Sequence, residues 1–464
     1  MNFNKKLAVA VSGAVLLMAG QFALADSTTD IVDALVSKGV LTEEEGKLIS
    51  KGHESKKKSE GTVTFKDGFK INSGDGQSNI SINGRIQLDS RSYSGNSGGA
   101  ANAKFADTFD VRRAYLGAKG TFKKYYDFEV TADFAGLTNA DTVSSSSTSL
   151  DVAYLNVNYW DKKAMFQFGQ FKMPYSLEER TSSRFIDFQE RSFVNNSSLT
   201  PGKERGVMLW GTPTAGVNYA LAFSTGQGKN TNDVNNLEDG KDTILHLDAN
   251  FAEIMGNKEA IFHVGGSYGF GDLPAAAIGT QRTEGRGNDF FKTGAPSGTS
   301  MERTRYNLES IAAYGPVKVQ AEYGNANFEG TNYDKEIDAY YAEALWLVTG
   351  EKYADAFKGG KFDRISPKNE FKPDFSSLGA IELGVRYSKF DASDIKLSAA
   401  TGPALTSNFT NEADAYTVGL KWIPQANARF LVNYVHTDFE TPVVVSSKTL
   451  NKEKALMFRA QYDF

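Results

Sequence analysis

Apolar and polar side chains alternate with a period of two along most of this chain. In SNISINGRIQLDS, Ile82 and Ile86 share one face, whereas Asn83 and Arg85 share the other. This alternation is typical of β-strands with one apolar and one polar face. Sixteen such stretches lie at 78–90, 107–122, 125–135, 150–160, 163–171, 205–212, 216–225, 242–251, 258–270, 303–314, 316–329, 337–349, 378–390, 412–422, 426–438 and 452–464. Most are close to the roughly 9–11 residues that a tilted strand needs to cross a bilayer.

The links between these stretches alternate between short and long. Lys123-Lys124, Asp161-Lys162 and Gly315-Pro316 are examples of the short links. The long links lie near 91–106, 136–149, 172–204, 226–241, 271–302, 391–411 and 439–451. Short turns on one side and long loops on the other are typical of an outer-membrane barrel. The link 350–377 falls on the side of the short turns although it has 28 residues, and the pattern gives no reason for its length.

These features favour a closed barrel over a soluble β-sandwich, which also shows alternation. In lipid every backbone polar group must be paired, and a closed sheet achieves this. The C-terminal Phe464, with Tyr462 on the same face, resembles the C-terminal signature of bacterial outer-membrane proteins. We therefore expect an all-β protein in which residues 59–464 form a sixteen-stranded antiparallel transmembrane β-barrel. A barrel of this size encloses a water-filled interior.

The N-terminal part of the chain has a different character. Residues 1–25 combine Lys5 and Lys6, an apolar stretch and an Ala-Leu-Ala cleavage site, which predicts a cleaved signal peptide and export. Residues 26–58 predict two short amphipathic helices and a polar linker on the periplasmic side. A capping box formed by Thr42 and Glu45 would open the second helix. This segment either packs against another subunit or envelope component, or is simply a periplasmic tail.

Composition narrows the function. The chain has no Cys, which suits an oxidising cell envelope, and its formal net charge is −5, which argues against a nucleic-acid partner. After the signal peptide there is no long apolar run, so a bundle of membrane helices is excluded. We expect a location in the bacterial outer membrane, with its lipid around the barrel.

Signals of catalysis are almost absent. The G-x-S-x-G match at 265–269 lies inside an alternating strand, whereas a nucleophile elbow needs a strand-to-helix turn. The four His residues are far apart in sequence and lack the spacing of metal ligands. We therefore predict that the protein is not an enzyme and has no metal or cofactor.

Cationic side chains on the polar face are the candidate functional residues. Arg85 lies on the first strand, and Arg113, Tyr115 and Lys119 share one face of the second. Strict alternation places Arg112 on the opposite, lipid-facing side unless a bulge shifts it or it sits at the rim. Mixed charge that only hydrates the interior is the simpler interpretation of any one of these residues.

The longest loop, at 172–204, carries balanced charges and many aromatic rings. Its charges sum to zero: Lys172, Arg180, Arg184, Arg191 and Lys203 oppose Glu178, Glu179, Asp187, Glu190 and Glu204. On an outward loop the rings would be exposed to water. We expect the loop to fold into the barrel, where paired charges would hold its shape and a few cations would remain for an ion.

Several motifs together resemble the phosphate-selective porin O and P family. They are NGRIQLD (83–89), VRRAYLGAKG (111–120), FGQFKMPYSLEERTSSR (168–184), LVTGE (347–351), KFDRISP (361–367) and NYVH (433–436). The resemblance runs from about residue 60 to the end. It implies a homotrimer of sixteen-stranded barrels whose third loop folds into the pore. It also implies passage of phosphate or pyrophosphate through an arginine-rich funnel.

Carried over by position, the resemblance assigns the central site to Arg85 and Arg191, with Tyr115 lining the pore. Asp151 would shape the same constriction, although alternation puts it in the lipid phase. In place of the family's central lysine this chain has Glu179, followed by Arg180. The arginine-dense fifth loop is thinned to a vestibule of Arg282, Arg286, Arg303 and Arg305.

The predicted function is passive, anion-preferring diffusion, with inorganic phosphate, polyphosphate or other small anions as the solute. Both departures from the family pattern weaken the case for strict phosphate selectivity. A general porin of weak selectivity is the first alternative. A structural protein whose barrel anchors the helices of 26–58 in the envelope is the second.

Overall fold

The computed structural model describes residues 32, 35–50, 61–65, 68–96, 107–137, 148–195, 199–226, 228–230, 241–274, 278–287, 289–294, 300–397, 402–445 and 448–464. The chain divides into two units, residues 1–63 with 71–79 and residues 64–70 with 80–464. Two short strands, β1 (Thr62–Thr64) and β2 (Phe69–Asn72), precede the long strands along the chain. Among the described residues, no helix is both long enough and apolar enough to span a bilayer.

In the first unit, residues 43–50 form a helix whose start is fixed by side chains. The Thr42 backbone N–H donates to Glu45 Oε2 at 2.9 Å, and the Glu45 N–H donates to Thr42 Oγ1 at 3.2 Å. These reciprocal bonds form the capping box expected at this position. The expected signal peptide, residues 1–25, lies outside the described residues.

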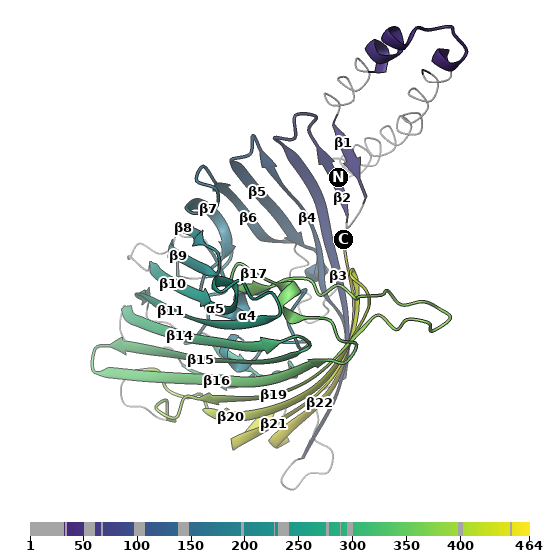
Figure 1. Cartoon of the computed structure of the whole chain (residues 1–464). Coiled ribbons are helices and arrows are strands. Elements are labelled where there is room, and N and C mark those ends of the chain that lie inside the picture. The colour runs from purple at the N-terminus through teal and green to yellow at the C-terminus, as the bar shows by residue number, and fades with distance from the viewer. Residues whose placement is uncertain are drawn as a thin grey trace, which may run out of the picture. The chain divides into compact units, whose positions relative to one another are not determined.

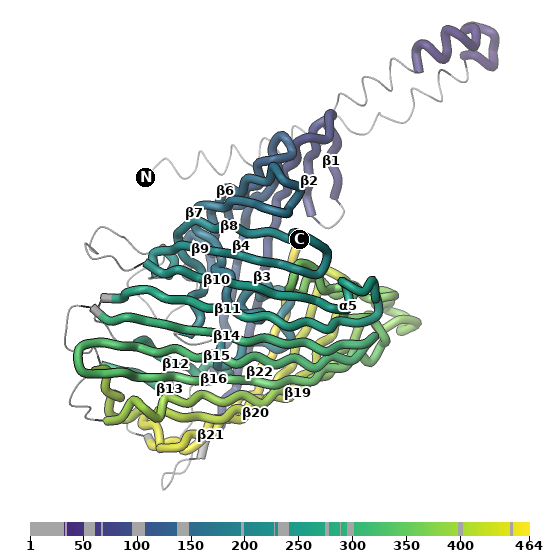
Figure 2. Tube along the Cα trace, turned by 60° about the vertical axis from the view of Figure 1, so that its left-hand side comes forward, coloured from purple at the N-terminus to yellow at the C-terminus, as the bar shows by residue number. Residues whose placement is uncertain are grey.

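In the second unit, sixteen antiparallel strands form a closed barrel (Figures 1 and 2). They are β3 (Asn79–Asn96), β4 (Thr108–Phe122), β5 (Tyr126–Asp133), β6 (Ser149–Val157), β7 (Met165–Lys172), β8 (Lys203–Thr214), β9 (Val217–Ser224), β10 (Asp242–Asn250), β11 (Ala260–Pro274), β14 (Ser300–Tyr314), β15 (Val317–Gly330), β16 (Tyr333–Leu347), β19 (Ala380–Asp391), β20 (Glu412–Gln425), β21 (Ala428–Val445) and β22 (Lys448–Asp463). Each overlaps one of the sixteen stretches expected from the alternation. The last strand pairs with the first, for example Phe458 with Ser90, and this pairing closes the sheet.

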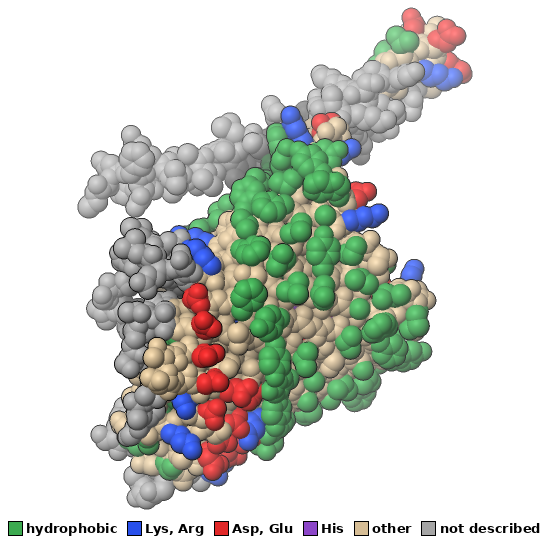
Figure 3. Space-filling view, turned by 90° about the vertical axis from the view of Figure 1, so that its left-hand side faces the viewer, with side chains coloured by type: hydrophobic (Ala, Val, Ile, Leu, Met, Phe, Trp, Pro, Cys, Tyr) green, Lys and Arg blue, Asp and Glu red, His purple; other side chains and the backbone are tan. Residues whose placement is uncertain are grey.

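Burial along the strands is the reverse of that in a soluble protein. On β3, Asn83, Arg85 and Gln87 are buried, whereas Ile82 and Ile86 are exposed. Figure 3 shows hydrophobic side chains spread over the outer face of the sheet, with acidic side chains gathered along one edge. This arrangement fits a wall with lipid outside and polar groups inside.

Aromatic side chains form rows on the outer face. Tyr387 lies 5.1 Å from Tyr416 and 6.1 Å from Tyr340, measured between ring centroids. The Trp422 ring stacks on that of Phe430 at 5.3 Å. Outer-membrane barrels carry such aromatic rings where the membrane meets water.

The links follow the expected alternation of short turns and long loops except at 331–332 and 350–377. Lys123 and Lys124 have positive φ angles of 49° and 67°, as in the two-residue turns that match the twist of paired strands. The β15–β16 link, Thr331–Asn332, is also tight although it falls on the side of the long loops.

The short elements of the links include η1 (Ala135–Leu137), α5 (Phe251–Ile254), β12 (Thr280–Arg282) and β13 (Asp289–Lys292).

The first part of the long link, residues 351–365, folds into the barrel, whereas residues 366–378 are mostly exposed. It contains η4 (Tyr353–Ala356), β17 (Phe357–Lys358) and β18 (Lys361–Phe362). Tyr353 and Phe362 are buried in one cluster with Leu345 of the wall and Leu177. A simple turn between neighbouring strands would need only a few residues. The residues up to Ile365 therefore fill part of the interior, and the exposed residues 366–378 lie outside this cluster.

The third loop, residues 173–202, also lies in the interior. It contains α4 (Leu177–Arg180) and η2 (Phe193–Asn195). The Gln189 N–H donates to Asn433 of β21 at 2.7 Å, and the Leu177 N–H donates to Glu322 of β15 at 3.0 Å. A loop that bonds to such distant strands of the wall crosses the barrel.

A pair of glycines forms the seat for one ring of this loop. Gly384 of β19 and Gly419 of β20 are direct partners in the sheet. A Cβ added at Gly384 would lie 3.1 Å from the ring of Phe188, and one at Gly419 would lie 2.9 Å from it. The Arg386 guanidinium lies 4.8 Å from the centre of the same ring. A Cβ at Gly419 would also lie 2.3 Å from the Asn433 amide nitrogen, and one at Gly384 would lie 3.0 Å from Leu345, so both positions favour glycine.

We expect Gly384→Val or Gly419→Val to displace Phe188 and loosen the third loop. Overpacking of this kind typically costs about 1–3 kcal/mol. Limited proteolysis of the folded barrel should then cleave within residues 173–202 faster than in the parent protein. Val418→Leu, on the lipid face of β20, is the matched control and should leave the rate unchanged. Equal cleavage rates in all variants would show that the glycines do not seat the loop.

Candidate functional site

Charge pairs fix the third loop to the barrel wall. Asp187 of the loop accepts from Lys318 of β15 at 2.7 Å. Glu178 pairs with Arg386 of β19 at 3.2 Å. Removing one partner of such a buried pair leaves an uncompensated charge, which typically costs about 3–5 kcal/mol. The loop is therefore held by pairs with the wall more than by pairs within itself.

Glu190 is the most heavily paired acid of the loop. Its carboxylate oxygens lie 2.9 Å from Arg112, 3.0 Å from Arg459, 3.4 Å from Arg91 and 3.9 Å from Arg286. Burial alone would raise its pKa, but the neighbouring guanidinium groups hold the pKa of Glu190 well below its usual range. The carboxylate consequently stays ionised at neutral pH and neutralises part of the surrounding positive charge.

Strict alternation fails at Arg112. The expectation of a lipid-facing Arg112 is wrong, because both Arg112 and its neighbour Arg113 reach interior groups. Arg112 binds Glu190, and Arg113 donates to Gln87 Oε1 at 2.9 Å. Arg112 and Arg113 are consecutive in β4, so one of them departs from the strict alternation.

Asp151 also departs from the expected phase. In the β5–β6 pair, Thr131 opposes Val152 and Ala132 opposes Leu150, so Asp151 is an extra residue in β6. This bulge turns Asp151 inward. There it accepts from Tyr115 Oη at 3.1 Å and from Lys203 Nζ at 2.5 Å.

Three of the proposed site arginines have only neutral partners. Arg85 donates to Ser183 Oγ at 2.9 Å, and its guanidinium lies 4.3 Å from the centre of the Tyr115 ring. Arg113 binds Gln87, and Arg184 donates to Asn83 Oδ1 at 3.3 Å. Within the described parts of the chain, no carboxylate oxygen comes within 4.0 Å of these three guanidinium groups. The charges of Arg113 and Arg184 both act on Arg85, and the charge of Asp151 opposes them from beyond 4.0 Å.

The other cations named for the constriction have a different environment. Arg191 Nε lies 3.2 Å from Glu179 Oε2, and Lys172 lies 3.6 Å from the same carboxylate. Arg180 turns away from them and binds Asp248 at 3.1 Å, and also Glu309. Glu179 is buried, but these two cations hold the pKa of Glu179 below its usual range. Arg180 and Arg191 are thus largely neutralised.

The four arginines of the proposed vestibule are paired as well. Arg282 lies 2.8 Å from Asp289 within the β12–β13 hairpin, and Arg286 reaches Glu190. Arg303 lies 2.5 Å from Asp242, and Arg305 binds the same carboxylate. Arg303 and Arg305 are buried in the wall. Lys119, by contrast, is exposed on the inner side of β4, in the phase of Arg113 and Tyr115.

Two cations near these groups were not singled out from the sequence. Arg429 is buried, donates to the Arg184 carbonyl at 2.6 Å and lies 4.8 Å from the centre of the Phe185 ring. Lys361 is exposed at the turn between β17 and β18. Arg429 lies on the polar face of the alternating stretch 426–438, and this position is what the sequence offered to indicate it. Lys361 could be found only through the unexplained length of its link.

The G-x-S-x-G serine has no nucleophilic geometry. Ser267 is buried in β11 and donates to the Tyr175 carbonyl. His246 Nδ1 lies 2.7 Å from Ser267 Oγ. A nucleophile needs its hydroxyl proton directed to a base, and here the proton is directed to a peptide carbonyl.

The closed sixteen-stranded barrel, with apolar residues outside and charged residues inside, defines the class: the protein is a porin of the bacterial outer membrane. Residues 80–464 match the family described as "Phosphate-selective porin O and P". The match spans most of the chain, and the chain belongs to this family.

Individual known proteins are similar over nearly the whole chain. Porin O of Pseudomonas aeruginosa is 24% identical over 427 residues, which cover 87% of this chain and 92% of that protein. An anion-selective porin from Comamonas acidovorans has a TM-score of 0.54 at 11% identity, covering 83% of this chain and 100% of that chain. OprB of Pseudomonas putida has a TM-score of 0.51 at 10% identity, covering 84% of this chain and 94% of that chain. At these identities the two solved structures show the shared fold alone.

The pairing of Glu179 predicts the effect of removing its charge. Glu179→Gln would leave Arg191 and Lys172 without their carboxylate. We expect the anion-to-cation permeability ratio to rise by roughly two- to fivefold, since a partly screened charge pair is worth about 0.5–1 kcal/mol. Reversal potentials in a salt gradient across a planar bilayer measure this ratio.

Glu259→Gln removes the same charge from an exposed pair with Lys352 and serves as the control. It should leave the ratio unchanged. If Glu179→Gln behaves like this control, the charge of Glu179 is not sensed along the ion path.

Proposed function

We propose that this porin gives passive, anion-preferring diffusion across the outer membrane, with inorganic phosphate or a related small oxyanion as solute. The observation that carries this proposal is the group Arg85, Arg113 and Arg184, whose partners are neutral. A guanidinium whose charge is not matched by a carboxylate can take an anion as its partner; Arg184 is half-buried, and Arg85 and Arg113 are buried beside it.

The chemistry of these three residues suits an oxyanion. Guanidinium groups bind phosphate through two parallel hydrogen bonds. A pair of unit charges about 4 Å apart is worth about 4 kcal/mol at an effective dielectric constant of about 20. Stacking on Tyr115 fixes the plane of Arg85, and the hydroxyl of Ser183 holds one end of it. Hydroxyl and amide partners exchange for a solute more readily than carboxylates do, and conduction requires binding weak enough for release.

A general porin of weak selectivity is the second candidate. It is favoured by the acid pairing of Arg180, Arg191, Arg303 and Arg305. Only a minority of the interior arginines therefore remains for selection. We place the protein between a strict phosphate channel and an unselective one, acting as a homotrimer and as a channel without enzymatic activity.

The three arginines give a direct test. We expect Arg85→Ala or Arg113→Ala to move the reversal potential toward cations and to weaken the block of chloride current by phosphate about tenfold. Loss of a hydrogen bond to a charged group costs about 1.5–3 kcal/mol, and 1.4 kcal/mol corresponds to a factor of ten. Planar-bilayer recordings in chloride with added phosphate measure both effects.

Lys352→Ala removes an exposed lysine far from the three arginines in sequence and is the charge-matched control. A cation-favouring reversal potential in the parent protein would refute the anion preference. Chloride current that is insensitive to phosphate would remove phosphate as the solute and leave the general porin. Absence of conductance would favour the structural anchor.

A further inference from the structure

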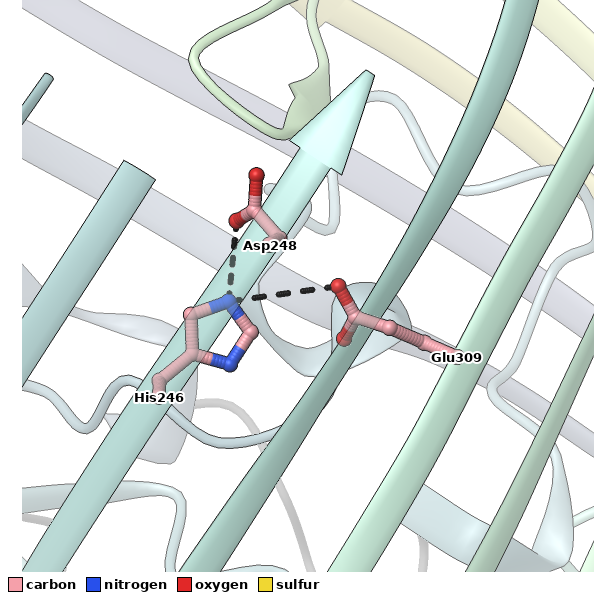
Figure 4. A group of neighbouring side chains, drawn as sticks. All are labelled: His246, Asp248 and Glu309. Atoms are coloured by element: carbon pink, nitrogen blue, oxygen red, sulfur yellow. Dashed lines mark hydrogen bonds and ion pairs between the residues drawn. The ribbon is translucent and has the colours of Figure 1, made fainter. Parts of the chain in front are cut away.

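Two histidines and two carboxylates that are separate in sequence meet on the inner side of three neighbouring strands. His246 and Asp248 lie on β10, His263 on β11 and Glu309 on β14. The sheet register brings them together. Gly265 of β11 opposes Asp248 on one side and Glu309 on the other, and His246 lies two residues from Asp248 on the same face. All four side chains are buried. Figure 4 shows His246, Asp248 and Glu309 pointing toward one another.

The distances are close to those of a metal site. His246 Nε2 lies 2.9 Å from Asp248 Oδ2 and 3.9 Å from Glu309 Oε1. The ligand atoms of His246, Asp248 and Glu309 all lie within 4.8 Å of one another. His263 adjoins them with Nε2 2.8 Å from Glu309 Oε1 and its other nitrogen, Nδ1, 3.9 Å from Asp248 Oδ1, so it can offer one nitrogen to an ion held by the other three. Donors around a tetrahedral Zn²⁺ lie roughly 3.4 Å apart, which follows from bonds of about 2.0–2.2 Å. Small side-chain shifts would therefore suffice.

Hydrogen-bond accounting at His246 calls for a positive charge in this position. The single hydroxyl hydrogen of Ser267 goes to the Tyr175 carbonyl, so Ser267 Oγ can only accept from His246 Nδ1. In a neutral ring, His246 Nε2 then carries a lone pair. That lone pair faces an oxygen of Asp248 at 2.9 Å. Two acceptors at this distance are stable only with a proton or a metal ion between them.

The charge of the cluster leads to the same conclusion. Arg180 is the only Lys or Arg of the described residues within 4.0 Å of Asp248 or Glu309. With neutral histidines, two buried carboxylates thus face one guanidinium. Glu309 Oε2 and His263 Nδ1 have no hydrogen-bond partner within the described part of the structure. Buried charges and polar atoms without partners are costly.

We propose that His246, Asp248, His263 and Glu309 bind a divalent transition metal of the Zn²⁺ type, which replaces the guanidinium of Arg180. Imidazole and carboxylate are suitable ligands for such ions. Asn218 donates to Asp248 Oδ1 at 2.7 Å, and Ser267 fixes the ring of His246, as outer contacts of metal ligands do. The metal brings two positive charges where Arg180 brings one. Arg180 is released toward the interior of the barrel, where it adds a positive charge.

Metal binding is tested without reference to conduction. The full-length protein, purified without a His tag and freed of metal, is titrated with Co²⁺ in detergent. We expect about one equivalent per chain with visible absorption bands of nitrogen and oxygen ligation, displaced by Zn²⁺. Arg180→Met should bind Co²⁺ more tightly than the parent, because the competing cation is gone.

Single His variants locate the site. His246→Ala and His263→Ala should each weaken Co²⁺ binding by at least about tenfold. His436→Ala is the matched control, since His436 lies on β21 beside Asp438, outside the cluster. Heat-dependent migration on gels checks that each variant is folded. No binding by the parent, binding only after removal of Arg180, or an equal loss in His436→Ala would each overturn the proposal.

Release of Arg180 is tested separately and rests on the proposed channel function. Zn²⁺ should move the reversal potential of the parent toward anions and leave that of Arg180→Met unchanged. The same shift in both proteins would refute the release of Arg180. A parent channel that prefers cations without Zn²⁺ would refute the proposed function, while the Co²⁺ titration would still decide the metal site.

Discussion

Most charges that the third loop carries into the barrel are matched there by opposite charges, and the arrangement of the interior depends on this pairing. The wall faces lipid with its apolar side, so most of its polar side chains turn inward. A loop among them cannot be placed by hydrophobic contact alone. Glu178, Asp187 and Glu190 each find cations on the wall, and Arg180 finds acids there. Buried ion pairs add little net stability, but a broken pair is costly, so they fix one arrangement of the loop.

The proposed selectivity depends on the arginines that this pairing leaves without a carboxylate. Arg303, Arg305 and Arg459 contribute little field to a passing ion, because acids neutralise them in the wall. Arg85 and Arg184 face each other across the contact between β3 and the loop, with only neutral partners. The number of arginines in a barrel is therefore a poor guide to its preference for anions. The number of arginines that have no carboxylate partner is the relevant quantity.

The sequence alone was sufficient for the wall of the barrel. Alternation of residue type is imposed by lipid on one side and water on the other, and it located all sixteen strands. It failed at Arg112, and at Asp151, where a bulge in β6 shifts the phase by one residue and leaves no mark in composition. The inward fold of residues 351–365 depends on packing of Tyr353 and Phe362 against distant strands. The meeting of His246 with His263 depends on strand register. Neither can be seen from spacing along the chain.

Glu179 and Arg180 illustrate why a local change of sequence does not translate directly into selectivity. They are neighbours in α4, and a short helical turn directs successive side chains to different sides. Glu179 meets Arg191 and Lys172, whereas Arg180 meets Asp248 and Glu309. The acid at position 179 therefore does not cancel the charge of the arginine beside it. It neutralises cations of its own loop, and Arg180 supplies a cation to a separate acidic cluster on the wall. The pair Glu179 and Arg180 thus acts in two environments at once. Its effect on ion permeation depends on the residues that each side chain contacts.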